Sequence, residues 1–240
     1  MESSEEQKRI IQDKNNIVVT ARPGSGKTYT IVEKIQLILE ELYNYQGIIA
    51  ISFTNKASEE LRKRCSSRGL LLNKSFFGTI DKFCFSEIIA PFCSHLSDRT
   101  QELKIKKYKK TDGLENLDKK NDDEIRKIIE EYLRQDIVFL ELLGETALYI
   151  LERVPDATRY LCAKYKEIFI DEYQDCDRSQ NAIFLYLVNQ GIKGMAVGDS
   201  HQAIYGFTKK NSVYLEQLTK DPNFVHYNLS VNCNNNLNTF

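Results

Sequence analysis

Long apolar runs are absent from this sequence, and none approaches the roughly 18 residues that a membrane-spanning helix needs. The acidic start, M-E-S-S-E-E, is also unlike a secretory signal peptide. The sequence also lacks an excess of either charge, since it contains 33 Lys and Arg and 34 Asp and Glu. Bulk charge therefore neither favours nor excludes nucleic acid, and any contact with phosphates must be local. We expect a soluble, cytoplasmic protein without a membrane partner.

The six cysteines lack a C-x-x-C pair and lack the spacing to histidine that a metal site would need. This pattern predicts ordinary buried or half-buried thiols in a reducing compartment. The cysteines are Cys65, Cys84, Cys93, Cys162, Cys176 and Cys233.

A glycine-rich turn follows the first apolar run. Residues 17–30 read I-V-V-T-A-R-P-G-S-G-K-T-Y-T. Gly24 and Gly26 let successive backbone N–H groups turn toward a phosphate, and the helix that begins near Lys27 directs its positive dipole end at the same anion. Lys27 supplies a charge for the β- and γ-phosphates, and the Thr28 hydroxyl suits Mg²⁺. The pattern G-x-x-x-x-G-K-[ST] is met only if Ala21 stands for its first glycine, and a simple Gly/Ser turn is the alternative.

Two carboxylates follow a later apolar strand, in E-I-F-I-D-E. Asp171 and Glu172 come at the carboxyl end of that strand, where open α/β sheets bind their ligands. Asp171 is predicted to hold Mg²⁺ through water, and Glu172 to orient and deprotonate the attacking water. A helix-capping turn is the alternative, but the preceding glycine turn favours catalysis. Farther on, the Gln202 amide has the chemistry to contact a γ-phosphate and the lytic water.

Several polar and aromatic residues suggest contacts to a base or to nucleic acid. Gln7, on a short helix expected over residues 3–13, can present a donor and an acceptor to an adenine edge, although a surface glutamine is the alternative. Phe53 ends the strand expected over residues 48–53 and is followed by a helix capped by Thr54 or Asn55. An aromatic ring there can stack on a base while the helix start holds a phosphate.

Two further clusters leave alternatives open. Tyr205 and Phe207 either stack on bases from an exposed turn or fill the core. The basic cluster K-I-K-K-Y-K-K, residues 104–110, either binds phosphates or is a solvated loop.

The chain changes character in its middle. Residues 92–164 are charged and helical in pattern, which predicts a helical insert between two parts of an α/β domain, residues 1–91 and 165–240. The spacing of apolar residues predicts one long amphipathic helix over Asp122–Leu143, and the preceding helix is expected to stop near Pro91. The asparagine-rich end from Tyr227 onward is expected to fray.

Five short sequence motifs, taken in chain order, resemble the first RecA-like domain of UvrD/Rep-type superfamily 1 helicases. The resemblance covers roughly residues 5–90 and 160–235, with the helical insert in the place of a 1B subdomain. In the residues around these motifs, the chain is similar to the helicase-like subunits of Gabija anti-phage systems. The phrases are G-S-G-K-T, S-F-T-N-K-A, G-T-I-D-K-F-C, I-D-E-Y-Q-D and V-G-D-x-x-Q-x-I-Y-G-F.

The resemblance implies a doubly wound, RecA-like P-loop fold, ATP and Mg²⁺ as cofactors, and single-stranded or end-bearing DNA as partner. It implies ATP contacts at Gln7, Ala21, Arg22, Pro23, Gly24, Ser25, Gly26, Lys27, Thr28 and Tyr29. It implies Mg²⁺ at Thr28 and Asp171, and hydrolysis through Lys27, Glu172 and Gln202. It implies DNA contacts at Phe53, Thr54, Asn55, Thr79, Tyr205 and Phe207. The Gabija likeness further implies an OLD-family nuclease subunit as partner and a role in antiviral defence.

Three departures weaken the analogy. Asn232, Cys233 and Asn234 stand where the family has N-[YF]-R, and Thr208 stands where an arginine often follows. The chain also ends before a second RecA-like domain, which supplies an arginine finger worth about 10³-fold or more in related phosphoryl transfer. We therefore expect slow hydrolysis and no strand separation by this chain alone. A binding module with decayed hydrolysis is the second hypothesis, and a small-molecule kinase is a disfavoured third.

Overall fold

The computed structural model describes residues 3–69, 71–96, 102–108, 120–199 and 212–230. The chain divides into two compact units, Met1–Thr79 with Cys162–Phe240 and Ile80–Leu161. The insert expected over residues 92–164 overlaps the second unit, and its assignment as a 1B-like subdomain stays a prediction. No helix in the described ranges has the length and apolar character needed to cross a bilayer.

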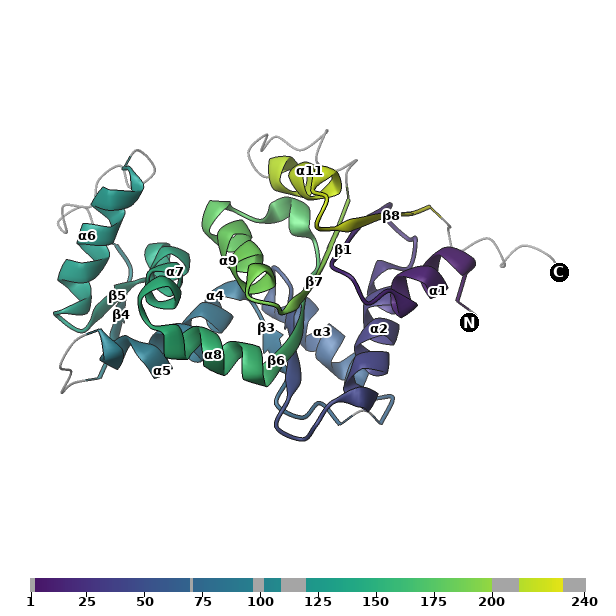
Figure 1. Ribbon diagram of the computed structural model, residues 1–240, viewed down its shortest axis with the longest axis horizontal. Helices are drawn as coiled ribbons and strands as arrows, with labels where there is room; N and C mark the ends of the chain where they lie inside the picture. Colours follow the sequence, from purple (N-terminus) through teal and green to yellow (C-terminus); the bar gives the residue numbers. More distant parts are fainter. Residues whose placement is uncertain (1–2, 70, 97–101, 109–119, 200–211, 231–240) are drawn as a thin grey trace. The chain divides into compact units, whose positions relative to one another are not determined.

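A six-stranded sheet forms the centre of the first unit, and each neighbouring pair of its strands is parallel (Figure 1). The strand order is β3-β2-β6-β7-β1-β8. β1 and β2 are buried at every position, as expected for parallel strands covered on both faces. The strands are β1 Ile17–Ala21, β2 Gly47–Ile51, β3 Phe76–Gly78, β6 Tyr165–Ile170, β7 Lys193–Gly198 and β8 Val225–Leu229.

Helices cover the sheet on both faces, which confirms the predicted doubly wound α/β class. The chain moves one way along the sheet from β1 to β2 to β3 and the other way from β6 to β7 to β8. Because crossovers are right-handed, α2 and α3 lie on one face and α9 and α11 on the other. The helices of this unit are α1 Glu5–Gln12, α2 Lys27–Glu41, α3 Asn55–Ser66, α9 Arg178–Asn189 and α11 Ser212–Lys220.

Side chains from both faces of the sheet form the core. On the α2–α3 face, a single apolar cluster joins Ile35 of α2 and Leu61 of α3 to strand residues such as Phe169. On the other face, the ring of Phe184 lies 5.1 Å from Tyr173 and 5.9 Å from Phe224. Burying this area on both faces is what holds the strands, and so their carboxyl ends, in register.

Local signals set several helix starts as predicted. Ser4 caps α1 in a reciprocal capping box with Gln7, and the Thr54 hydroxyl caps α3 by accepting from the Ala57 N–H at 3.1 Å. The cysteine interpretation also holds for the five described cysteines, which are free thiols and buried or half-buried. Cys233 lies outside the described residues.

The second unit corrects the prediction of one long helix over Asp122–Leu143. Helix α6 ends at Leu133, and the chain then turns through Asp136, whose φ is 59°. Ile137–Phe139 forms strand β5, which pairs with β4, although few strand signals were present in this part of the sequence. The apolar spacing misled because it continues unbroken into β5 and the next helix. The elements are α6 Asp122–Leu133, β4 Lys104–Lys106, β5 Ile137–Phe139, η5 Leu140–Leu142, α7 Leu143–Arg153 and α8 Pro155–Lys164, which leads into β6.

The helix stops near Pro91 as expected, whereas the expectation for the chain from Tyr227 onward is wrong for its first residues. A π-helical turn leads into α5, Pro91 lies in the first turn of α5, where a missing N–H is tolerated, and α5 ends at Phe92 before a short 3-10 helix. Tyr227–Leu229 does not fray but lies in β8, paired along β1. The helical elements in question are α4 Ile80–Phe83, η1 Cys84–Ile89, α5 Ala90–Phe92 and η2 Cys93–His95.

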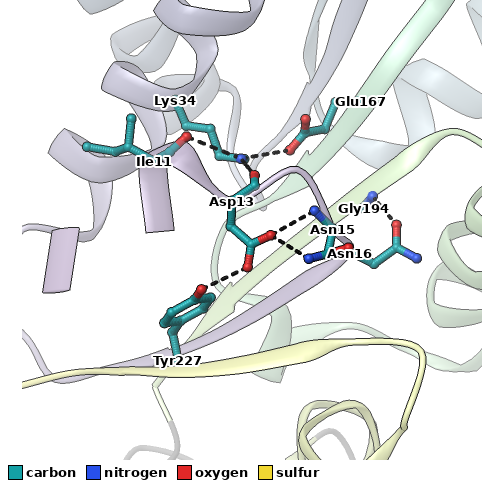
Figure 2. Close-up of polar contacts among 8 residues, drawn as sticks. All are labelled: Ile11, Asp13, Asn15, Asn16, Lys34, Glu167, Gly194 and Tyr227. Carbon is teal, nitrogen blue, oxygen red and sulfur yellow. Dashed lines mark hydrogen bonds and ion pairs between the residues drawn. The ribbon is translucent and has the colours of Figure 1, made fainter. Parts of the chain in front are cut away.

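A polar cluster built around two buried side chains, Lys34 and Glu167, lies toward the amino ends of the strands (Figure 2). The ammonium of Lys34, a side chain of α2 that is almost fully buried, donates to the Asp13 carbonyl and lies 3.9 Å from the Glu167 carboxylate. The Asp13 carboxylate accepts from the Tyr227 hydroxyl at 2.8 Å and from the backbone and side chain of Asn15. The cluster thus ties the α1–β1 connection to α2, β6 and β8, at the edge of the sheet opposite the glycine turn.

Glu167 gives this cluster an expected dependence on pH. Burial raises the pKa of Glu167 from 4.5 to about 7, Lys34 and Lys193 oppose the rise, and Asp13 adds to it. Between those pH values the folded protein keeps a proton that the unfolded chain has lost, so stability falls as pH rises, by about 3 kcal/mol in all. We expect Glu167→Gln to remove that fall.

Urea unfolding at pH 5 and pH 8 measures the effect. The loss of stability between the two pH values should be smaller in Glu167→Gln than in the wild type. Glu59→Gln, at an exposed glutamate of α3, is the matched control and should keep the wild-type loss. An equal loss in all three proteins would contradict the assignment.

Candidate functional site

The turn between β1 and α2 has the geometry of an anion cradle. Gly24 and Gly26 have φ angles of 78° and 89°, in the left-handed region that glycine adopts at little cost. Gly26 is the N-cap of α2, where no side-chain cap is present and the first turn holds no acidic residue. The amino end of this 15-residue helix therefore fits a phosphate chain, which would meet backbone N–H groups and the positive end of the dipole.

Lys27 and Glu172 meet at this cradle although 145 positions separate them. The Lys27 ammonium donates to Oε1 of Glu172 at 2.9 Å and to Oε2 at 3.1 Å. β7 lies between β1 and β6 in the sheet, so Lys27 reaches across the carboxyl end of β7 to make this ion pair. The Lys27 side chain is only 12% exposed and that of Glu172 39%, so the pair is partly shielded from solvent.

The backbone at Glu172 is unusual for its residue type. Its φ of 56° and ψ of 41° are left-handed, and it is the N-cap of the short 3-10 helix η6 Tyr173–Asp175. A non-glycine residue in this region costs of order 1 kcal/mol, and such strain concentrates at functional sites. The side-chain amide of Gln174 also donates to Glu172 Oε2, at 2.7 Å, so two groups hold the carboxylate.

Asp171 lies directly after β6, beside Glu172. Its carboxylate accepts from the Glu172 N–H at 3.0 Å, and its own N–H donates to the Ile51 carbonyl at the end of β2. Burial, and next the charge of Glu172, raise the pKa of Asp171 to about 6, with Lys27 opposing. Two adjacent carboxyl groups in a shielded site favour a compensating cation.

The residues present fit Mg²⁺ held together with a nucleotide. Thr28, the second residue of α2, offers a hydroxyl and Asp171 a carboxylate, both of them hard oxygen ligands. Among the described residues, no group of three or more His, Cys, Asp or Glu could hold a metal by itself. Mg²⁺ commonly binds through one or two protein oxygens, with phosphate oxygens and water completing its shell.

The other predicted ATP-binding residues lie around the same turn. Gln7 is buried on α1, and its side-chain oxygen accepts from the Ser4 N–H at 2.9 Å. The Tyr29 hydroxyl of α2 is 3.0 Å from the Ser3 hydroxyl, which brings the starts of α1 and α2 together. Ala21 and Ser25 are buried, and Arg22 and Pro23 are exposed.

The predicted DNA-binding residues that the structure describes follow β2 and β3. Phe53, Thr54 and Asn55 come after β2, and Thr79 comes directly after β3, which pairs with β2. Phe53 and Thr79 are half-buried, whereas Thr54 and Asn55 are exposed. All four follow strand ends at the same edge as the glycine turn and the two carboxylates. The predicted Gln202, Tyr205 and Phe207 lie outside the described residues, as do Thr208, Asn232 and Asn234.

Residues 171–175 and the end of β7 hold a contact that the sequence did not predict. Gln174 is 5% exposed, and its side-chain oxygen accepts from the Asp199 N–H at 2.9 Å. The place of Gln174, three positions after Asp171 in I-D-E-Y-Q-D, was the available signal. Its partner, the residue directly after β7, cannot be deduced from spacing, because β6 and β7 become neighbours only in the folded sheet.

Comparison with known proteins shows the family to which this chain is similar. Residues 3–141 and 92–223 match the family described as UvrD/REP helicase N-terminal domain. The Gabija protein GajB of Bacillus cereus is 37% identical over 238 residues, which are 94% of this chain and 45% of that protein. The ATP-dependent DNA helicase PcrA of Staphylococcus epidermidis is 25% identical over 251 residues, 85% of this chain and 34% of that protein.

The Pif1 helicase of Candida albicans gives a TM-score of 0.47 at 14% identity, covering 96% of this chain and 40% of the other. The chain therefore spans less than half the length of each of these proteins.

Proposed function

The chain belongs to the UvrD/REP helicase family, and from this we propose that it is a DNA-dependent ATPase domain whose pocket is formed by the β1–α2 turn, Asp171 and Glu172. The observation that carries the proposal is the contact of Lys27 with Glu172, which joins the phosphate cradle to the carboxylates. ATP with Mg²⁺, when bound, would supply the phosphoryl group and its charge-neutralising cation.

Each residue of the pocket has a separate task in this proposal. The backbone around Gly24 and Gly26 binds phosphate oxygens, and Lys27 gives up its contact to Glu172 in order to bind the terminal phosphates. Thr28 and Asp171 would hold Mg²⁺. Glu172, released from Lys27, accepts a proton from the attacking water.

We also propose that single-stranded DNA runs over the ends of β2 and β3. Phe53 offers a ring for stacking, and Thr54, Asn55 and Thr79 offer polar groups for phosphates. The Asp171 N–H bond to the Ile51 carbonyl connects the end of β2 to the carboxylates, which supports communication between DNA and the ATP pocket. Gln202, Tyr205 and Phe207 are proposed as further contributors on the basis of the family pattern alone.

The similarity to GajB supports a narrower proposal, in which the chain acts in antiviral defence together with a nuclease subunit. The same proposal includes that this nuclease subunit belongs to the OLD family. The chain spans less than half of its relatives, so strand separation is not ascribed to it.

ATP turnover with and without single-stranded DNA tests the function. We expect slow basal turnover of the 240-residue chain that rises when DNA is added. Phe53→Ala should raise the DNA concentration for half-maximal stimulation about 10-fold, within the 1–3 kcal/mol that one stacked base contributes. Leu71→Ala, at a side chain 79% exposed, is a control that should leave the stimulation unchanged.

Two other outcomes would replace this proposal. Tight ATP binding without turnover in any mixture would indicate a nucleotide-binding module with decayed hydrolysis. Transfer of phosphate to a metabolite in place of water would indicate a kinase.

A further inference from the structure

Gln174 bridges the two strand ends on which the pocket depends. Its Nε2 donates to Glu172 Oε2 at 2.7 Å, and its Oε1 accepts from the Asp199 N–H at 2.9 Å. A carboxylate can only accept and a backbone N–H can only donate, so these two partners allow one orientation of the amide. The side chain is 5% exposed, and competition from water for either bond is therefore small.

The end of β7 is shaped to admit this amide. A Cβ atom at Gly198 would lie 2.7 Å from Oε1 of Gln174 and 2.8 Å from Cδ2 of Leu215. Any side chain at this position would therefore push the amide away from the Asp199 N–H. Glycine at the last position of β7 keeps the bridge between β6 and β7 in place.

The bridge becomes decisive when nucleotide binds. Lys27 and Gln174 are the two side chains that bond the Glu172 carboxylate in the described structure. Lys27 cannot keep its full ion pair with Glu172 while it neutralises phosphates, so the Glu172 carboxylate loses one of its two side-chain partners. Gln174 carries no charge and has no such competing partner in the described contacts.

We infer that Gln174 is a positioning residue: it holds the Glu172 carboxylate in place once Lys27 has turned to the phosphates, and it fixes that carboxylate relative to the end of β7. This inference rests on the proposed function. Misplacing a reacting group by about 1 Å can cost on the order of 10²-fold in rate, so the bridge should affect turnover and leave binding alone.

Two substitutions separate positioning from a structural tie. Gln174→Met fills the same volume without either bond, and we expect kcat to fall about 10- to 100-fold with an unchanged Kd for a non-hydrolysable ATP analogue. Gln174→Glu keeps an oxygen for the Asp199 N–H but places a second carboxylate against Glu172. It should lose as much kcat as Gln174→Met, whereas recovery of kcat in Gln174→Glu would show a structural tie only and overturn the inference.

Tyr173→Phe is the matched control. It removes the bond from the Tyr173 hydroxyl to Asn181 Oδ1, 2.7 Å long, in the same turn but without contact to Glu172. Wild-type kcat in this variant supports the inference. A loss equal to that of Gln174→Met would overturn it, because any loosening of the turn would then suffice.

The side-chain amide NMR signal of Gln174, assigned by its absence in Gln174→Met, tests the bridge without turnover. Its chemical shift should change in Glu172→Gln and stay the same in Tyr173→Phe. An unchanged chemical shift in Glu172→Gln overturns the inference even if the wild type hydrolyses ATP. A wild-type chain without turnover but with the expected NMR shift would instead overturn the proposed function, and with it the catalytic part of this role.

Discussion

Glu172→Gln should lower ATP turnover by about 10²- to 10⁴-fold, the usual contribution of a general base. The same variant should bind ATP at least as tightly as the wild type. The structure gives the reason, because the Lys27 ammonium is bonded to both oxygens of Glu172. A neutral amide releases Lys27 to the phosphates, while it cannot take a proton from water.

Single-turnover hydrolysis and equilibrium binding of a fluorescent ATP analogue measure the two effects separately. Glu167→Gln is the matched control, since it removes a buried carboxylate from the amino-terminal half of β6, the strand that precedes Glu172. This control should keep turnover at a pH where it is folded. Weaker nucleotide binding by Glu172→Gln would contradict the idea that Lys27 and Glu172 hold each other before ATP arrives.

Lys27→Met should weaken ATP binding by about 10- to 100-fold, the equivalent of 1.5–3 kcal/mol for hydrogen bonds to a charged group. Methionine retains the apolar stem that lies in the pocket, so the fold should survive. Turnover should fall as well, because the terminal phosphates lose their protein cation. The free Glu172 carboxylate would then face the phosphates without compensation, which adds to the loss of affinity.

Isothermal titration with a non-hydrolysable ATP analogue measures this effect. Lys63→Met, at a 75% exposed side chain of α3, is the control and should bind as the wild type does. Wild-type affinity in Lys27→Met would place the nucleotide elsewhere on the protein.

The sequence predicted both the doubly wound fold class and the approach of the glycine turn to the carboxylates after β6. Lys27 and Glu172 could be paired in advance because each follows a buried parallel strand, and the carboxyl ends of such strands meet at one edge. Neither residue needs a particular distant partner to be recognised. The chemistry of a glycine turn and of paired acids is visible in a few consecutive letters.

The parts that could not be predicted depend on contacts made only in the folded chain. The spacing of apolar residues continues through Asp136, so the end of α6 could not be predicted from the sequence. It depends on the pairing of β5 with β4. The polar segment β8 forms a strand because it pairs with β1 and because Tyr227 donates a hydrogen bond to Asp13. The bridge of Gln174 likewise needed the neighbouring strand.

The most direct measurement is a crystal structure of the chain with a non-hydrolysable ATP analogue and Mg²⁺. We predict Lys27 bonded to the phosphates, Mg²⁺ held between Thr28 and Asp171, and Glu172 still bonded to Gln174. A nucleotide bound away from the β1–α2 turn, or phosphates at that turn with both carboxylates directed elsewhere, would contradict the account.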